Sequence, residues 1–454
     1  MKRTVGLLLV VVALAALMLS VPIQAKTQVI VWGINPLQVG SGNKEMIDAF
    51  NASHPDIELV PQSTPGTGGY ATQDVAKLLA AIASGNPPDV TWLDRFTAAQ
   101  FASRGALMAI DQFIEIHNFD VSGYVDYTID ELRFDGQLWG LPWDTDTRPL
   151  YWNKDVFRDA GLDPEVPPKT WDELIAYTQK ITRVDDEGKF ERIGYIPGYG
   201  NTWLYLYAYA NGAKVLSDDG RTSLVNAPEM VEALQFVVDF YEMLGGAEKV
   251  NAYQSTFQGE ANNPFLTGLV GMLVTVNNAT QTYARYKPDL DYGAALPPAP
   301  AGKPQTTWSG GWSYAIPKGA KNAEAAFEVI RWLTTEGPKP KERGAAAYTL
   351  ERGSQYHIPF PYAYTPTNDY MIEEYVASID NTVVREAVMG GLNAIEHSQA
   401  RPVSPVGEVL WVELARANDR AIYGEMTPQQ ALDYAHRVVQ RELDRFWQRY
   451  DQEN

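Results

Sequence analysis

The sequence predicts an α/β protein with two domains. The chain has 454 residues, which is too long for one simple core and suits two domains. Apolar residues make up 45% and charged residues 20%, so a core of ordinary size can form. Short apolar runs alternate with amphipathic stretches along the N-terminal part of the chain, and this alternation is typical of a parallel sheet covered by helices.

The alternation begins close to the N-terminus. Apolar runs at 29–32, 57–60 and 89–93 predict three buried strands. Apolar residues recur at helical spacing over 42–53 and 74–84, and these stretches predict the two connecting helices. Ser41 stands where a side chain can cap the first helix.

Similar signals follow in the rest of the chain. Thr170 and Glu173 have the spacing of a capping box and predict a helix to Ile181. Asp219-Gly220 predicts a hairpin turn. Further helices are expected from Pro228 to about 245, over 323–335, and from Thr427 toward 450.

The N-terminus has the three-part pattern of a secretory signal peptide. Lys2 and Arg3 precede an apolar run from Val5 to Leu19, and a short stretch of small and polar residues ends at Ala25. The run is shorter than the roughly 20 apolar residues that a spanning helix needs. We therefore expect residues 1–25 to be removed and the protein to be exported, periplasmic or extracellular. Because the chain has no cysteine, a lipid anchor on cysteine is impossible.

Composition excludes several classes of function. The formal net charge of -19 makes nucleic acid an unsuitable partner. Without cysteine there is no disulfide, thiolate metal site or cysteine nucleophile, and the five histidines lack zinc-site spacing. The glycine-rich stretch 64–70 lacks the Gly-Lys-Ser/Thr ending of a phosphate loop. We expect no metal, no cofactor and a monomer.

One segment, 134–155, concentrates aromatic residues and carboxylates. Asp144 and Asp146 are two positions apart, so they share one face of an extended chain. Such a pair can accept hydrogen bonds from sugar hydroxyls, act as an acid/base pair of a hydrolase, or bind calcium. A solvated strand edge is the simplest alternative.

Two further clusters are rich in tryptophan. Trp308 and Trp312 flank Gly310-Gly311, where backbone can approach a ligand closely. An indole face suits the C–H side of a sugar ring, although core tryptophans beside a tight turn have the same pattern. Trp203 opens a stretch to 207 that is either a helix or a strand, and we expect it to be the ring nearest a ligand there.

Four stretches together carry a family resemblance: 50–59, 81–94, 140–157 with 168–174, and 310–317 followed by 323–333. In order and spacing they resemble the extracellular solute-binding proteins of family 1, the maltose-binding-protein-like class. The resemblance covers nearly all of the chain after residue 25. It implies a type II periplasmic-binding-protein (Venus-flytrap) fold, in which two α/β lobes enclose a ligand cleft. By similarity the first lobe is 26–146 with 297–337, and the second is 147–296 with 338–454.

The resemblance also implies a function and a site. The chain would be the substrate-binding component of an ABC importer, capturing a sugar or oligosaccharide and delivering it to the permease, and would not be an enzyme. The alternatives are a secreted glycoside hydrolase that uses Asp94, Asp144 or Asp146, and a binder of a peptide or polyamine. The positions that match the family's cleft, the last three more loosely, are Asp94, Asp144, Asp146, Trp308, Gly310, Gly311, Trp312, Trp32, Trp143 and Trp203.

Overall fold

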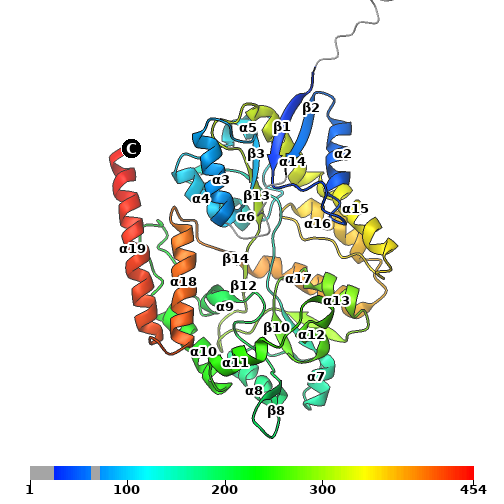
Figure 1. Ribbon diagram of the computed structural model, residues 1–454, viewed down its shortest axis with the longest axis vertical. Coiled ribbons are helices and arrows are strands. Elements are labelled where there is room, and N and C mark those ends of the chain that lie inside the picture. The colour runs from blue at the N-terminus through cyan, green and yellow to red at the C-terminus, as the bar shows by residue number, and fades with distance from the viewer. Residues whose placement is uncertain (1–24, 63–71, 454) are drawn as a thin grey trace, which may run out of the picture.

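The computed structural model describes residues 25–62 and 72–453, and its elements form two groups stacked along the long axis (Figure 1). The group drawn at the top is built around β1 (Thr27–Trp32), and the group below it around β7 (Leu150–Asn153). The expected signal peptide lies, apart from Ala25, outside the described residues.

The first group contains a five-stranded sheet in the order β2-β1-β3-β13-β6. β1 pairs in parallel with β2 (Ile57–Gln62) and β3 (Val90–Asp94), which confirms the expected parallel strands. β13 (Trp312–Ala315) returns from far along the chain and runs antiparallel to β3 and to β6 (Leu141–Pro142).

Helices cover this sheet, and most are short. They pack on it through one apolar face each, as Phe327 and Ile330 of α14 do. The helices, with the 3-10 turn η1 and the β4–β5 hairpin, are α2 (Asn43–Ser53), α3 (Thr72–Ala83), η1 (Arg95–Thr97), α4 (Ala98–Ser103), α5 (Asp111–Ile116), α6 (Asp126–Asp130), β4 (Arg133–Phe134), β5 (Gln137–Leu138), α14 (Ala323–Thr335), α15 (Pro338–Glu351) and α16 (Thr365–Met371).

The second group is mostly helical. Its sheet places β7 between β10 (Met272–Val274) and β11 (Tyr292–Ala295), both antiparallel to it, and β12 (Thr307–Ser309) pairs in parallel with β14 (Ser398–Ala400). The remaining elements are α7 (Lys154–Asp159), α8 (Trp171–Ile181), β8 (Arg183–Val184), β9 (Phe190–Arg192), α9 (Trp203–Ala210), α10 (Pro228–Met243), α11 (Ala247–Gln254), η2 (Glu260–Asn262), α12 (Pro264–Thr267), α13 (Ala279–Tyr286), η3 (Ile372–Val376), α17 (Thr382–Asn393), η4 (Ala394–His397), α18 (Gly407–Ile422) and α19 (Pro428–Glu453).

Local sequence signals account for several helix starts. The capping box of α8 is confirmed: Glu173 N donates to Thr170 Oγ1 at 3.2 Å, and Thr170 N donates to the Glu173 carboxylate at 3.1 Å. The helix from Pro228 and the long last helix are also present. Gly42 takes the N-cap position of α2 in a left-handed conformation (φ 71°), and the expected cap at Ser41 acts from one position earlier: Ser41 Oγ accepts a hydrogen bond from Asn43 N at 3.2 Å.

Each group has its own hydrophobic core, and the residues in these two cores show where the chain crosses between the groups. Trp308 packs into the second core, whereas Tyr362 and Met371 pack into the first. α15 lies so close to α2 that a Cβ on Gly42 would be 1.8 Å from the carbonyl oxygen of Lys341. We therefore propose crossings at 143–150, 308–312 and 371–376, in place of the limits 146/147, 296/297 and 337/338 that the resemblance implies.

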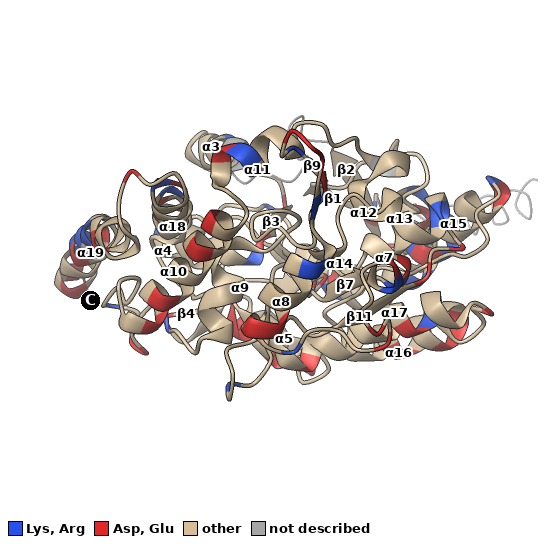
Figure 2. Cartoon of the chain, turned by 90° about the horizontal axis from the view of Figure 1, so that it is seen from below, with Lys and Arg blue, Asp and Glu red and all other residues tan. Residues whose placement is uncertain are grey.

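The C-terminal helix reaches both groups. α19 runs along one side of the molecule toward the first lobe (Figure 1), and Phe446 contacts Phe134 of the β4–β5 hairpin with ring centres 6.2 Å apart. Basic and acidic residues are interspersed on this helix (Figure 2), as on a solvated surface. Within the described part of the chain, no helix has the length and apolarity needed to cross a bilayer.

The first two crossings lie side by side as an antiparallel pair. Trp143 N donates to the Trp312 carbonyl at 2.9 Å, and Asp146 N donates to the Gly310 carbonyl at 3.3 Å. Gly311 sits at the closest point: its φ is 144°, and a Cβ there would be 2.1 Å from Nη1 of Arg95 and 2.6 Å from the Asp144 carbonyl oxygen. Only glycine fits this conformation and this space.

We expect Gly311→Ala to lower the free energy of unfolding by roughly 3 kcal/mol, because it adds backbone strain and a clash with a buried guanidinium. Gly302→Ala is the matched control: its φ is also positive (82°), but the added Cβ meets open space. It should cost about 1 kcal/mol. Urea unfolding measures both, and equal losses would show that the close approach at 311 is not what requires glycine.

Candidate functional site

The two aspartates of the central segment bind the neighbouring crossing. Asp144 Oδ1 accepts a hydrogen bond from Trp312 N, and Asp146 Oδ1 accepts one from Gly310 N at 2.6 Å. The prediction that both carboxylates share a face is confirmed. Asp144 is buried (3% exposed), so its carboxylate faces the crossing, whereas the side chain of Asp146 is 24% exposed.

Arg148 and Trp308 form the next layer. The Arg148 guanidinium pairs with Asp146 and lies over the Trp308 indole, with its central carbon 3.4 Å from the ring centre. Trp308 is 2% exposed, and its Nε1 donates to the Thr202 carbonyl at 2.9 Å. Trp308 is therefore a buried platform for Arg148, and no face of its ring is open to a ligand in this structure.

Asp94 is engaged across the two lobes. Its carboxylate receives Nη2 of Arg401 at 2.5 Å and Nη1 at 3.1 Å. Arg401 follows β14 in the second lobe, whereas Asp94 ends β3 in the first. Beneath this pair, Arg95 and Glu131 form a fully buried ion pair at 2.8 Å. Arg401 Nε also lies 3.4 Å from Glu131, so this arginine of the second lobe pairs with two carboxylates of the first.

The first lobe presents a stack of indoles beside these charges. Trp312 stacks on Trp92 with ring centres 4.0 Å apart and an interplanar angle of 21°, and it remains partly exposed. Trp32, also partly exposed, donates from Nε1 to Gln62 at 3.0 Å. Trp143 is buried edge-to-face against Trp92. Trp312 and Trp32 therefore have open surface, and Trp143 supports the Trp92–Trp312 stack from inside.

Trp203 is the exposed ring of the second lobe. Its side chain is 42% exposed and lies 4.4 Å, centre to centre, from the partly exposed ring of Trp411 on α18. The backbone of Trp203 has φ 54°, a left-handed conformation that a bulky residue rarely adopts. Strain of this kind clusters at binding and catalytic sites, because the surrounding fold must impose it.

Three hollows adjoin one another: the first lies between the lobes, and the other two are lined by residues of the second lobe. The first, between α13 and α15, the second, at Tyr199 and Thr275, and the third, beside Trp203 and Trp411, have empty volumes of about 1080, 740 and 1040 Å³. Thr282 lines the first two, and Gly198 and Gly200 line the last two. Neighbouring hollows therefore adjoin, and we refer to the three together as the path. Asn201, which accepts a hydrogen bond from Arg148 Nε at 3.3 Å, stands between Gly200 and Thr202, which line the third hollow.

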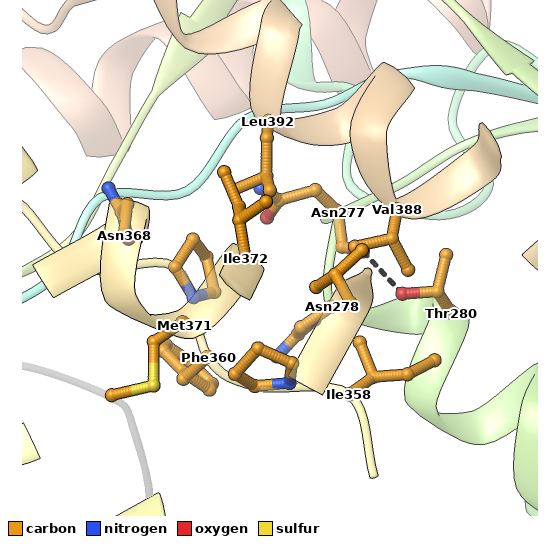
Figure 3. Close-up of a pocket in the computed structure, with 13 residues that line it drawn as sticks. Asn277, Asn278, Thr280, Ile358, Phe360, Asn368, Met371, Ile372, Val388 and Leu392 are labelled. Atoms are coloured by element: carbon orange, nitrogen blue, oxygen red, sulfur yellow. Dashed lines mark hydrogen bonds between the residues drawn. The ribbon is translucent and has the colours of Figure 1, made fainter. Parts of the chain in front are cut away.

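A smaller hollow of about 360 Å³ lies at the third crossing, where the start of α13, the segment 358–361 and α17 meet (Figure 3). Apolar side chains such as Met371 and Leu392 dominate its wall, and Thr280 Oγ1 donates to the Asn277 carbonyl at its edge at 3.0 Å. Ile358 and Phe360 line both this hollow and the first of the three, so it backs onto the path.

The sequence did not indicate several residues that build the site. Arg148 was detectable in principle, because it follows Asp146 by two positions and so lies on the same face. Arg401 was not, since it is 307 positions from its partner Asp94. Trp92, Arg95 and Trp411 have side chains whose roles depend on packing between distant segments.

Burial has a large effect on Asp144. Desolvation raises the pKa of this carboxyl to about 7, although the Trp312 N–H and the charge of Arg95 oppose the shift. The folded protein therefore binds a proton at Asp144 more tightly than the unfolded chain does.

With this geometry established, comparison with known proteins identifies the class. The model of the bacterial extracellular solute-binding protein family matches residues 35–340. The chain belongs to this family. Its members are binding proteins, and the family assignment agrees with the two groups of elements and with the hollow between α13 and α15.

Curated relatives match over most of the chain. The sn-glycerol-3-phosphate-binding periplasmic protein UgpB of Escherichia coli is 27% identical over 451 residues, which cover 93% of this chain and 94% of the relative. UgpB of Pectobacterium atrosepticum is 28% identical over 351 residues, which cover 73% and 74%.

Solved structures show the same fold. CpMnBP1 with mannobiose bound has a TM-score of 0.72 and 25% identity, and the match covers 91% of this chain and 100% of that one. The sugar-binding protein MalE from Xanthomonas citri also has a TM-score of 0.72, at 21% identity, covering 94% and 100%. The expected two-lobe, maltose-binding-protein-like fold is confirmed.

The raised pKa of Asp144 predicts a pH dependence of stability. Its stabilising contribution is complete below the unfolded pKa near 4 and declines as the pH rises to about 7. Relative to Asp144→Asn, the wild-type free energy of unfolding should fall by up to about 4 kcal/mol between pH 4 and 7, at roughly 1.4 kcal/mol per pKa unit. Urea titrations at four pH values test this. Parallel curves for the two proteins would show that Asp144 does not titrate in this range.

Proposed function

We propose that this protein captures an oligosaccharide between its lobes and delivers it to the permease of an ABC importer. The observation that carries the proposal is that both lobes present indoles with open surface beside the paired charges of the centre. Trp312 belongs to the first lobe, and Trp203 and Trp411 to the second. CpMnBP1 and MalE, which have this fold, are a mannobiose-bound and a sugar-binding protein by name.

The side chains supply what a sugar needs. A flat indole covers the C–H face of a pyranose ring, and such contacts contribute about 0.5–1.5 kcal/mol beyond buried area. Asp146 uses only Oδ1 within the described structure, so its second carboxylate oxygen is available to a hydroxyl. Tyr205 lines the third hollow, and its buried hydroxyl has no partner among the described residues, so we propose it as a further donor to a sugar oxygen.

The electrostatics of the centre favour a neutral ring over a small phosphate ester. The UgpB relatives bind sn-glycerol 3-phosphate by name, and a phosphate needs unpaired positive charge. Here Arg148 is paired with Asp146, Arg401 with Asp94, and Arg95 with Glu131. Each guanidinium of the centre already has its carboxylate.

The same pairing argues against a hydrolase. Glycoside hydrolysis requires one carboxylic acid free to protonate the leaving oxygen and a second carboxylate free to act on the sugar or on water. Asp144 binds the backbone at Trp312, while Asp146 and Asp94 are ion-paired with arginines. We propose that the protein binds its sugar without cleaving it.

Capture follows from selection between open and closed lobes. A ligand that contacts both lobes favours the closed form through the contacts it makes only there. Moving the equilibrium from 1:99 to 99:1 takes about 5.5 kcal/mol, which stacked rings from two lobes and several charged hydrogen bonds can supply. We further propose that the protein is exported by cleavage after Ala25, as the N-terminal pattern indicates.

A thermal-shift screen tests the function directly. We expect neutral oligosaccharides to raise the melting temperature, while sn-glycerol 3-phosphate has a smaller effect at equal concentration, and we expect no release of reducing ends during incubation. A strong shift with glycerol phosphate alone would contradict the assignment to saccharides, and released reducing ends would assign the protein to the hydrolases.

The rings can be tested one at a time. We expect Trp312→Ala and Trp203→Ala each to weaken binding of the tightest oligosaccharide about ten-fold, which corresponds to roughly 1.4 kcal/mol. Trp447→Ala on α19 is the matched control, since this indole packs against Arg221 away from the path. Calorimetric affinities measure the effect. Unchanged affinity in both site variants would remove the rings from the site.

A further inference from the structure

The first of the three hollows differs in character from the rest of the path. It lies between α15 of the first lobe and α13 of the second, and Gln38 and Ser41 close it from the loop before α2. Aromatic and polar side chains share its wall, and three of its residues carry basic groups: Arg285, Lys341 and His357. Residues of both lobes therefore bring positive charge to one space.

Only one carboxylate lies among them. Glu342 is buried, with its oxygens 3.3 Å from Lys341 Nζ and 2.8 Å from His357 Nε2. Burial alone would raise the pKa of Glu342, but Lys341, His357 and the Tyr362 hydroxyl outweigh it and lower the pKa to about 2. Glu342 is therefore a fixed negative charge that neutralises one cation of the hollow.

Arg285 is the cation of this hollow that Glu342 does not neutralise. Arg285 is exposed, its guanidinium lies 5.0 Å from the ring centre of Tyr286, and it forms no ion pair with any described residue. Lys341 is held in place by the rings of Trp143 at 5.3 Å and Phe360 at 5.9 Å. Figure 2 shows basic residues on α15, within a chain whose net charge is -19. The chain as a whole is acidic, so an uncompensated positive charge in an interlobe hollow runs against its overall charge balance.

We propose that this hollow receives an anionic group at one end of the bound saccharide, such as the carboxylate of a uronic acid or a phosphate ester. The inference rests on the proposed saccharide function. Arg285 pairs with the anionic group from the second lobe, while Lys341, whose charge Glu342 balances, lies on the first-lobe wall of the same hollow.

The path fits such a ligand. The first hollow adjoins the second at Thr282, and the second adjoins the third, with its indoles, at Gly200. A chain of sugar units can therefore place its neutral rings at the indoles and its charged unit at Arg285. Arg148 and Arg401, the arginines that the described structure places at the centre beside Asp146 and Asp94, are both paired, so the charged unit is directed to this end.

Matched disaccharides test the proposal. Four pairs built on mannose, glucose, galactose and xylose, each neutral or carrying a terminal uronic acid, are titrated by calorimetry together with sn-glycerol 3-phosphate. We expect the acidic member of at least one pair to bind about ten-fold more tightly than its neutral partner, since a charge-assisted hydrogen bond is roughly that strong. Glycerol phosphate binding as tightly would identify a phosphate ester as the anion.

Two variants assign the effect. Arg285→Gln should reduce the acidic-to-neutral affinity ratio to near one, whereas Arg343→Gln, which removes the same charge from an exposed position of α15 outside the hollow, should leave the ratio unchanged. Neutral sugars that bind as well as acidic ones, or equal losses in both variants, would overturn the inference and leave the saccharide function intact. Binding of none of the eight sugars would overturn that function as well.

Discussion

The pairing of the first two crossings between the lobes is the interaction on which the rest of the site depends. Asp144 and Asp146 hold the backbone of 310–312 through hydrogen bonds to Trp312 N and Gly310 N. Two carboxylates at a lobe junction are costly to desolvate, and removing one partner of a buried charge pair typically costs about 3–5 kcal/mol. Arg95, which donates to the Asp144 carbonyl, and Arg148 offset that cost.

This pairing sets the geometry of the binding surface. Since Trp312 N is fixed by Asp144, the Trp312 ring is held in its stack on Trp92 and remains partly exposed. Since Asp146 orients Arg148, the guanidinium covers Trp308 and separates that ring from solvent. The same charges that join the lobes therefore decide which indoles a ligand can touch, and Arg401 on Asp94 completes the junction from the second lobe.

Much of the fold follows from local signals, whereas the roles of the site residues do not. The buried strands and the capping box at Thr170 were predictable, because each depends on residues close in sequence. Period-two spacing placed Asp144 and Asp146 on one face, but their partners lie 168 and 164 positions away, so nothing local shows that they bind backbone and not solute. Trp308 and Trp312 have similar contexts in sequence, yet the chain breaks at Gly310-Gly311 between strands β12 and β13. The two indoles therefore belong to different sheets, and only Trp308 is buried.

The central claim is that a saccharide lies between indoles contributed by both lobes. A crystal structure of the protein with the oligosaccharide that raises its melting temperature most would test it directly. The account predicts pyranose rings along the path between Trp312 and Trp203, with a hydroxyl on the free oxygen of Asp146. Density for the sugar on one lobe alone, or away from both indoles, would contradict it.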